Sequence, residues 1–158
     1  MKIGIIGLGF VGLSLTSVLA SKGYDVIGID VDNEKCNKII NGISPFFEPE
    51  LEKTLQNGLK KKLKIENNFS LINTCDFIFV TVGTPQKSNG SIDLSKIKKA
   101  ISTIAENLLK NDKKPIIIIK STVIPGTTKK VILPILEKKL NKKNGKGFGL
   151  ISNPEFLQ

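Results

Sequence analysis

Histidine and arginine are both absent from this chain of 158 residues, and all 24 of its basic side chains are lysine. Without histidine, the chain lacks the usual base that activates a cysteine and the commonest metal ligand. The two cysteines, Cys36 and Cys75, are too few for a disulfide framework, and we expect free, buried thiols. The sequence therefore predicts neither a metal centre nor a cysteine nucleophile.

Long hydrophobic runs are also missing. No apolar run approaches the ~20 residues that a membrane-spanning helix needs. The apolar N-terminus carries glycines, and no small-residue cleavage site follows it as in a signal peptide. We expect no membrane partner and, by default, a cytoplasmic location. With 40% hydrophobic and 24% charged residues, residues 1–158 fit one globular domain.

Negative charge is scarce, because 14 acidic residues face 24 lysines and leave a formal net charge of +10. Such a charge is typical of nucleic-acid binding, but here the lysines are spread along the chain without interleaved aromatics or arginine. We expect solvated helix faces and loops, and no nucleic-acid partner.

What the chain does contain is a glycine-rich turn between a strand and a helix. Residues 3–6 form a short apolar run rich in β-branched isoleucine, as in a strand buried on both faces, and residues 14–21 have helical spacing. Between them, Gly7 allows a tight turn, Gly9 lets a pyrophosphate approach the backbone, and Gly12 lets the helix pack closely. The N-terminus of that helix attracts phosphate. This order predicts a dinucleotide site, although a plain βαβ turn without a ligand is the alternative.

An acid at the end of the second strand indicates which dinucleotide binds. Residues 24–30 form an apolar run that ends in Asp30, 18 residues after Gly12. This is close to the roughly 20 expected for the acid that accepts from the adenosine ribose hydroxyls. A carboxylate there repels the 2′-phosphate of NADP, and the chain has no arginine to bind that phosphate. The sequence therefore predicts NAD.

Further strands and helices alternate along the rest of the chain. The segment Asp32-Asn33-Glu34-Lys35 is expected to cap a helix that runs to about Gly42, with Lys35 in its first turn, and Pro49 is expected to begin the next helix. This alternation predicts an α/β fold with a doubly wound parallel sheet of the Rossmann type, a three-layer sandwich. Three later strands end in polar clusters, which should share a crevice with the glycine turn: Gly83-Thr84-Pro85, Ser121-Thr122 and Asn153-Pro154-Glu155.

Five blocks together resemble the N-terminal, NAD-binding domain of the UDP-glucose/GDP-mannose (nucleotide-sugar) dehydrogenase family. The first block fits many dehydrogenases, whereas the last two in this order are more particular. The blocks are Gly7-Leu8-Gly9-Phe10-Val11-Gly12-Leu13, Pro45-Phe46-Phe47-Glu48-Pro49, Val82-Gly83-Thr84-Pro85, Lys120-Ser121-Thr122-Val123-Ile124-Pro125-Gly126-Thr127 and Asn153-Pro154-Glu155-Phe156-Leu157.

The resemblance implies oxidation of a sugar C6 alcohol to an aldehyde, an enzyme thioester and then a carboxylate, with two NAD reduced. It implies catalytic roles for Glu155 and Thr122, with a water as acid/base element. It implies that the segment Pro154, Glu155, Phe156 and Leu157 faces the nucleotide-sugar substrate. The residues that it implies for NAD are the glycine block with Phe10 and Val11, and Asp30, Lys35, Thr84, Thr122 and Glu155.

Two departures accompany this resemblance. Family members usually carry glycine where this chain has Glu50. Their nucleophilic cysteine, a lysine, a second aspartate and the helix of the homodimer come from a C-terminal half that these residues do not include. We therefore expect a cofactor half that binds NAD but does not complete the oxidation alone. Another Rossmann dehydrogenase, of the 3-hydroxyacid type, and a non-catalytic NAD-binding module are the alternatives.

Overall fold

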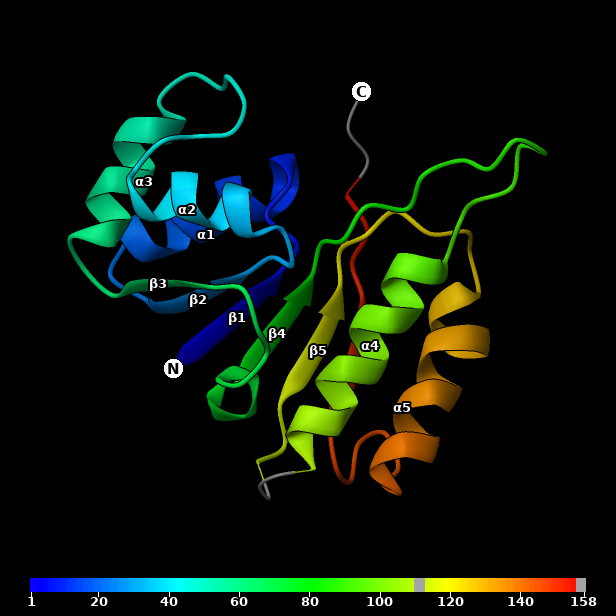
Figure 1. Ribbon diagram of the computed structural model, residues 1–158. Helices are drawn as coiled ribbons and strands as arrows, with labels where there is room; N and C mark the ends of the chain where they lie inside the picture. Colours follow the sequence, from blue (N-terminus) through cyan, green and yellow to red (C-terminus); the bar gives the residue numbers. More distant parts are fainter. Residues whose placement is uncertain (110–112, 156–158) are drawn as a thin grey trace.

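A fully parallel, six-stranded sheet forms the centre of the computed structural model, which describes residues 1–109 and 113–155 (Figure 1). The strand order is β3-β2-β1-β4-β5-β6, and every neighbouring pair is parallel. This order reverses direction between β1 and β4, which is where doubly wound sheets hold their ligands. The strands are β1 (Lys2–Ile6), β2 (Asp25–Ile29), β3 (Leu63–Glu66), β4 (Phe77–Val80), β5 (Ile116–Ile119) and β6 (Gly149–Ser152).

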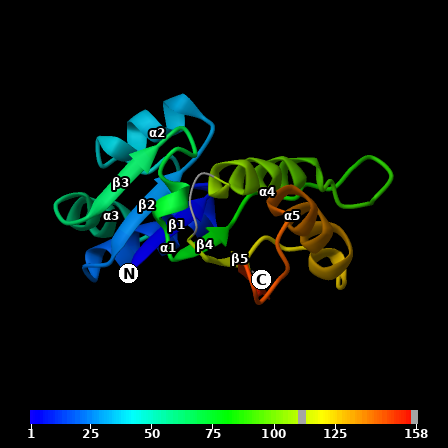
Figure 2. The ribbon, with the colours of Figure 1, turned by 90° about the horizontal axis from the view of Figure 1, so that it is seen from below.

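Helices cover both faces of the sheet, so the predicted three-layer, doubly wound fold is confirmed. One face packs on α1 (Phe10–Ser21), α2 (Asn33–Ile40) and α3 (Leu51–Leu59). The other packs on α4 (Ser95–Leu108), α5 (Leu133–Leu140) and two short elements, a 3₁₀ turn (Ile72–Thr74) and a π-helical turn (Thr128–Ile132). Figure 2 shows α1–α3 gathered around β1–β3 and α4 and α5 together beside β5.

The alternation of side chains along each strand explains the two separate cores. In β1, Ile3 and Ile5 belong to the core under α1–α3, whereas Ile6 belongs to the core under α4 and α5. The isoleucine run of β5 is largely buried: Ile117 and Ile119 belong to the core under α4 and α5, and Ile118, which alternates to the opposite face, is 6% exposed. Both cysteines are free and buried, as predicted.

The starts of α2 and α3 differ in how well the sequence predicted them. The cap of α2 comes from the expected segment: Asp32 is the N-cap residue, and its Oδ1 accepts the main-chain N–H of Lys35 at 3.0 Å. The prediction that Pro49 begins the next helix is wrong: α3 begins at Leu51. Glu50 precedes it with a left-handed backbone (φ +61°), which glycine adopts without strain.

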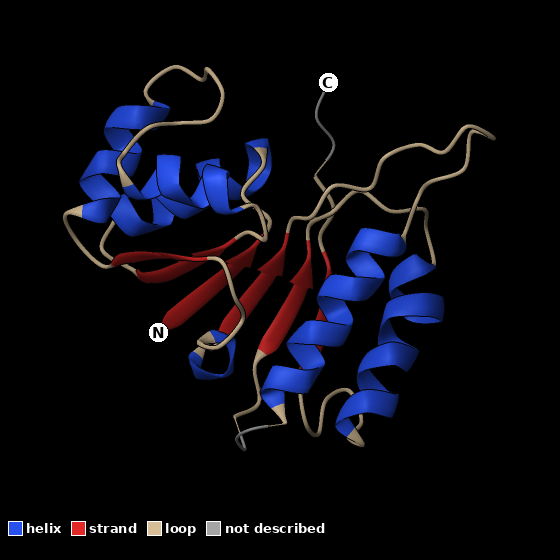
Figure 3. Cartoon of the chain, viewed as in Figure 1, coloured by secondary structure: helices blue, strands red, loops and turns tan. Residues whose placement is uncertain are grey.

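All strands point the same way, so their carboxyl ends and the loops that follow them line one edge of the sheet (Figure 3).

Within residues 1–109 and 113–155, helices of the length and apolarity that a bilayer crossing requires were not found.

Candidate functional site

The glycine turn joins β1 to α1 and is held against the end of β4. Gly7 has a φ of +94°, and a Cβ there would lie 3.0 Å from the main chain of Val82. A Cβ on Gly12 would lie only 1.8 Å from the carbonyl oxygen of Gly7. The hydroxyl of Thr81 donates to the carbonyls of Ile6 and Gly7 at 2.9 and 2.6 Å. The first turn of α1 therefore packs tightly on both strands, as predicted for these two glycines.

Gly9 has the opposite surroundings, because in the described part of the chain a Cβ built there meets no heavy atom within 4 Å beyond its own neighbours in the chain and helix. It is the N-cap residue of α1, and no side chain caps this helix end or places an acid in its first turn. The first N–H groups of a helix have no partner within the helix and form an anion site. Open space beside an uncapped helix N-terminus fits a pyrophosphate.

The aromatic loop between α2 and α3 lies against this turn. The ring of Phe46 stacks on that of Phe10, the first residue of α1, with centroids 4.1 Å apart and planes tilted by 38°. Phe10 remains 60% exposed beside Phe46. The loop therefore forms a wall beside the glycine turn.

Asp30 stands directly after β2 and is 9% exposed. Its Oδ2 accepts the N–H of Leu8 and the ammonium of Lys35, both at 2.8 Å, and its Oδ1 accepts the N–H of Asp32 at 3.1 Å. Burial by itself raises the pKa of Asp30, but the Lys35 ammonium and the two N–H groups outweigh it and lower the pKa below its usual value. The carboxylate is ionised and fixed, and its remaining lone pairs can accept from ribose hydroxyls.

The predicted polar clusters meet at the carboxyl ends of β4, β5 and β6. The hydroxyl of Thr84 donates to the carbonyl of Thr122 at 2.6 Å, and the hydroxyl of Thr122 donates to the carbonyl of Glu155 at 2.8 Å. The side chain of Ser121 donates to the carbonyl of Val82 at 2.7 Å. These contacts place the three clusters beside one another, next to the glycine turn. Phe156 and Leu157 lie outside the described residues.

Lys120 belongs to this site, although the sequence pattern predicted no role for it. Its ammonium lies 2.7 Å from Oε2 of Glu155 and 3.3 Å from Oδ1 of Asn153. Its side chain is 14% exposed, against 41% for Glu155. The signal that could have found it is a charged residue directly after a run of four isoleucines, Ile116–Ile119. The Glu155 carboxylate therefore pairs with Lys120, while Thr122 binds only the main chain of Glu155.

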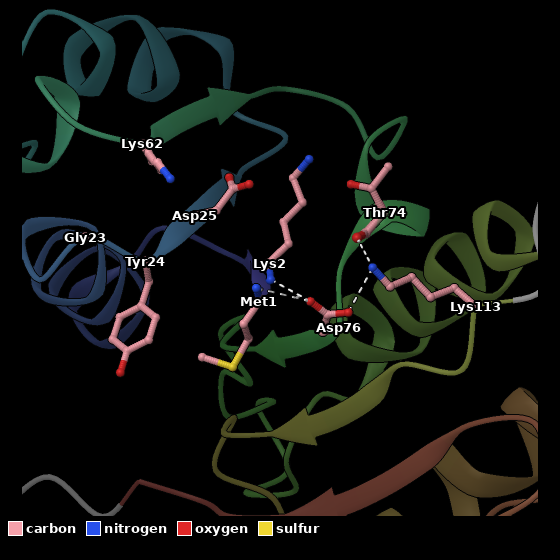
Figure 4. A pocket seen from close by; sticks show the side chains of 9 residues that line it. All are labelled: Met1, Lys2, Gly23, Tyr24, Asp25, Lys62, Thr74, Asp76 and Lys113. Carbon is pink, nitrogen blue, oxygen red and sulfur yellow. Dashed lines mark hydrogen bonds and ion pairs between the residues drawn. The ribbon is translucent and has the colours of Figure 1, made fainter.

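A hollow at the opposite edge of the sheet is a poorer candidate (Figure 4). Open α/β sheets bind ligands at the carboxyl ends of their strands, whereas this hollow lies at the amino ends of β1, β2 and β4. Its central acid, Asp76, is already paired with Lys113 at 2.9 Å and accepts the N–H of Lys2 at 2.6 Å. The hollow is lined by Met1, Lys2, Gly23, Tyr24, Asp25, Lys62, Thr74, Asp76 and Lys113.

Known proteins resemble the chain over its whole length. The family model for the NAD-binding domain of the UDP-glucose/GDP-mannose dehydrogenase family matches residues 1–158. The GDP-mannose 6-dehydrogenase of Pseudomonas syringae pv. tomato is 41% identical over 160 residues, which cover 100% of this chain and 36% of the relative. The UDP-glucose 6-dehydrogenase of Haloferax volcanii is 34% identical over 158 residues, 100% of this chain and 37% of the relative.

A solved structure agrees with these relatives. The ternary complex of the GDP-mannose dehydrogenase of Pseudomonas aeruginosa superposes with a TM-score of 0.96 at 38% identity, covering 100% of this chain and 37% of that one. The chain thus spans little more than a third of the length of the relatives it matches. Matched over its whole length, it belongs to the UDP-glucose/GDP-mannose dehydrogenase family as its NAD-binding domain, which confirms the predicted family, fold and cofactor.

Proposed function

We propose that residues 1–158 are the cofactor-binding half of an NAD-dependent nucleotide-sugar 6-dehydrogenase. The observation that carries this proposal is the meeting of the open glycine turn, the fixed Asp30 carboxylate and the linked loops of Thr84, Thr122 and Glu155 along one edge of the sheet. Relatives named for GDP-mannose and UDP-glucose support a sugar nucleotide as substrate.

Each part of this edge has a separate task in the proposed site. The uncapped start of α1 and the space at Gly9 hold the pyrophosphate, and Asp30, positioned by Lys35, accepts from the adenosine ribose. Because Asp30 fixes the adenosine end at β2, the dinucleotide extends toward β4–β6. Bound NAD supplies the hydride acceptor at that end.

Glu155 is the side chain that we assign to proton transfer. Its carboxylate is fixed by Lys120 and is 41% exposed, so a water or a sugar hydroxyl can reach it. The hydroxyl of Thr122 donates to the main chain of Glu155. We propose that the segment from Pro154 to Leu157 faces the substrate. In this proposal Thr122 acts on the reaction chiefly through the position that it gives to Glu155.

Calorimetric titration of the chain with NAD tests the cofactor half. We expect NAD to bind and NADP to bind at least tenfold more weakly, because the Asp30 carboxylate repels the 2′-phosphate. Asp30→Asn should weaken NAD roughly tenfold or more, since hydrogen bonds to a charged acceptor are lost. Lys139→Met, which breaks an exposed ion pair with Glu106, is the control and should bind as wild type. A folded wild-type chain without affinity for NAD would contradict the proposal.

A second experiment tests the reaction and the alternatives. The chain is joined to the portion of the P. syringae relative that follows its matched region, and GDP-mannose or UDP-glucose is added with NAD. We expect two NADH for each sugar oxidised with one of the two substrates, and none when Glu155→Gln is introduced. NAD binding without oxidation of either sugar would favour a non-catalytic module. Oxidation of a 3-hydroxyacid would favour that class, which the family match disfavours.

The same proposal covers the assembly and location of the longer protein, which we propose is a cytoplasmic homodimer. Light scattering of the joined protein should give twice the mass of one chain, whereas a monomeric mass would contradict the assembly.

A further inference from the structure

The position of the nicotinamide ring follows from the ends of the sheet, and this step rests on the proposed function. With the adenosine ribose on Asp30 at β2, a dinucleotide that crosses the glycine turn reaches the loops after β4, β5 and β6. The carboxylate at this second end is that of Glu155, and the ammonium paired with it is that of Lys120. The charges of these two side chains therefore act on the ring.

The ion pair is built into the backbone as well as the side chains. The N–H of Glu155 donates to the carbonyl of Lys120 at 3.1 Å, so the two residues are joined at their main chains too. Asn153 accepts from the ammonium at 3.3 Å and holds it from a second side. A pair that is fixed and mostly buried on the lysine side is screened less by water than a surface pair.

The two forms of the cofactor differ in charge at this end of the molecule. The nicotinamide ring of NAD is positively charged, and the dihydronicotinamide ring of NADH is neutral. A lone carboxylate beside the ring would favour the oxidised form, and a lone ammonium would favour the reduced form. The pair presents both charges and cancels most of this preference.

We propose that Lys120 is a specificity-determining residue whose ammonium balances the Glu155 carboxylate, so that the site binds NAD and NADH with comparable affinity. A reaction that reduces two cofactors for each sugar needs this balance, because NADH must leave and NAD must enter twice. An unbalanced carboxylate would hold the oxidised form too firmly, and an unbalanced ammonium would retain the product.

The ratio of NADH to NAD dissociation constants, measured by calorimetry on the whole chain, tests the proposal without any catalysis. We expect Lys120→Met to shift this ratio roughly five- to tenfold in favour of NAD. Glu155→Gln should shift it by a similar factor in favour of NADH, because the ammonium is then unbalanced. The double variant should return to within about twofold of wild type, and Lys120→Arg should stay there because it keeps the charge.

The controls separate charge from structure. Lys139→Met removes a lysine from an exposed pair with Glu106 and should leave the ratio unchanged. If Lys120→Met weakens both cofactors by the same factor, Lys120 has only a structural role and the proposal is wrong. If Lys120→Met does not fold, Glu155→Gln decides, and an unchanged ratio in that variant overturns the proposal. A wild-type chain that binds neither form overturns the proposed function itself, and this inference with it.

Discussion

At the scale of single residues, Gly12 is expected to matter for the stability of the fold, whereas Gly9 is expected to matter for ligand binding. Gly12→Ala would place a Cβ 1.8 Å from a carbonyl oxygen, so the turn or α1 must move, and we expect a loss of about 1–3 kcal/mol or more in the free energy of unfolding. Gly9→Ala has open space and an ordinary φ of −79°, so its loss should stay within about 1 kcal/mol.

The same Gly9→Ala variant should bind NAD at least tenfold more weakly, because the added methyl group occupies the space of the pyrophosphate. Urea unfolding gives the stability, and calorimetry gives the affinity. Wild-type affinity in a stable Gly9→Ala variant would show that the phosphates lie elsewhere.

The two thiols give a second prediction at this scale. Burial raises the pKa of Cys75 to about 11 and also raises the pKa of Cys36 above its usual value. Both thiols are therefore protonated at pH 8, and since the thiolate is the nucleophile, both should be inert in the folded chain. We expect reaction with a disulfide reagent to be at least about a hundredfold slower than in urea. Fast labelling of either cysteine in the folded chain would contradict the buried placement.

At the scale of elements, the start of α3 carries strain that one substitution removes. Glu50 has a φ of +61°, a conformation that costs a residue with a Cβ roughly 1–2 kcal/mol. Glu50→Gly should therefore raise the free energy of unfolding, by about 0.5–1 kcal/mol after the larger entropy of glycine in the unfolded chain is counted.

Asn141, at the end of α5, is the matched control because its φ is +49° and asparagine tolerates this region. Asn141→Gly should change stability less than Glu50→Gly, as measured by urea unfolding of both variants. Destabilisation by Glu50→Gly would show that the glutamate side chain contributes more than its backbone costs.

The elements also show where sequence patterns are sufficient. Apolar, largely β-branched runs predicted the inner strands of the sheet, because a strand inside a parallel sheet is covered on both faces. The edge strands β3 and β6 are less apolar and gave a weaker pattern. The start of α3 was mispredicted because Pro49 suits a first helical position, and no local pattern indicates that Glu50 adopts a left-handed backbone.

The topology of the sheet was sufficient to predict where the candidate site lies, but one of its side-chain contacts, the ion pair of Lys120 with Glu155, was not predicted. Thr84, Thr122 and Glu155 follow strands, and parallel strands bring such residues to one edge. The partnership of Lys120 with Glu155 depends on the register between β5 and β6, in which Ile119 lies opposite Ser152. Periodicity along one strand carries no information about register with another, so the pair could not be derived.

At the scale of the whole molecule, acid should unfold the chain. Hydrogen bonds lower the pKa of four carboxyl groups. At Asp30, burial raises the pKa but hydrogen bonds, chiefly from the Lys35 ammonium, outweigh it. A lysine side chain is the main donor to Asp76 and to Glu137, and a main-chain N–H is the main donor to Asp93. A carboxyl group whose pKa is lower in the folded state stabilises the folded state at pH values above its pKa in the unfolded chain, near 4. This contribution is lost as pH falls through its pKa in the folded state.

The formal net charge of +10 adds repulsion once the acids are protonated. We expect the urea midpoint to be level from about pH 7 to 5 and to fall steeply below about pH 4. Asp30→Asn should lower the midpoint at pH 7 and make its fall in acid shallower. An equally steep fall in that variant would show that Asp30 contributes little to acid unfolding.

The links between the loops after β4, β5 and β6 have a mechanical consequence. Thr84 donates to the backbone after β5, and Thr122 donates to the backbone after β6, so each hydroxyl anchors the neighbouring loop instead of its own. Thr84 is therefore linked to the main chain of Glu155 through two successive hydrogen bonds, with Thr122 between them. Two threonine hydroxyls thus join the three loops into one connected rim, so replacement of either threonine by valine removes a link between neighbouring loops.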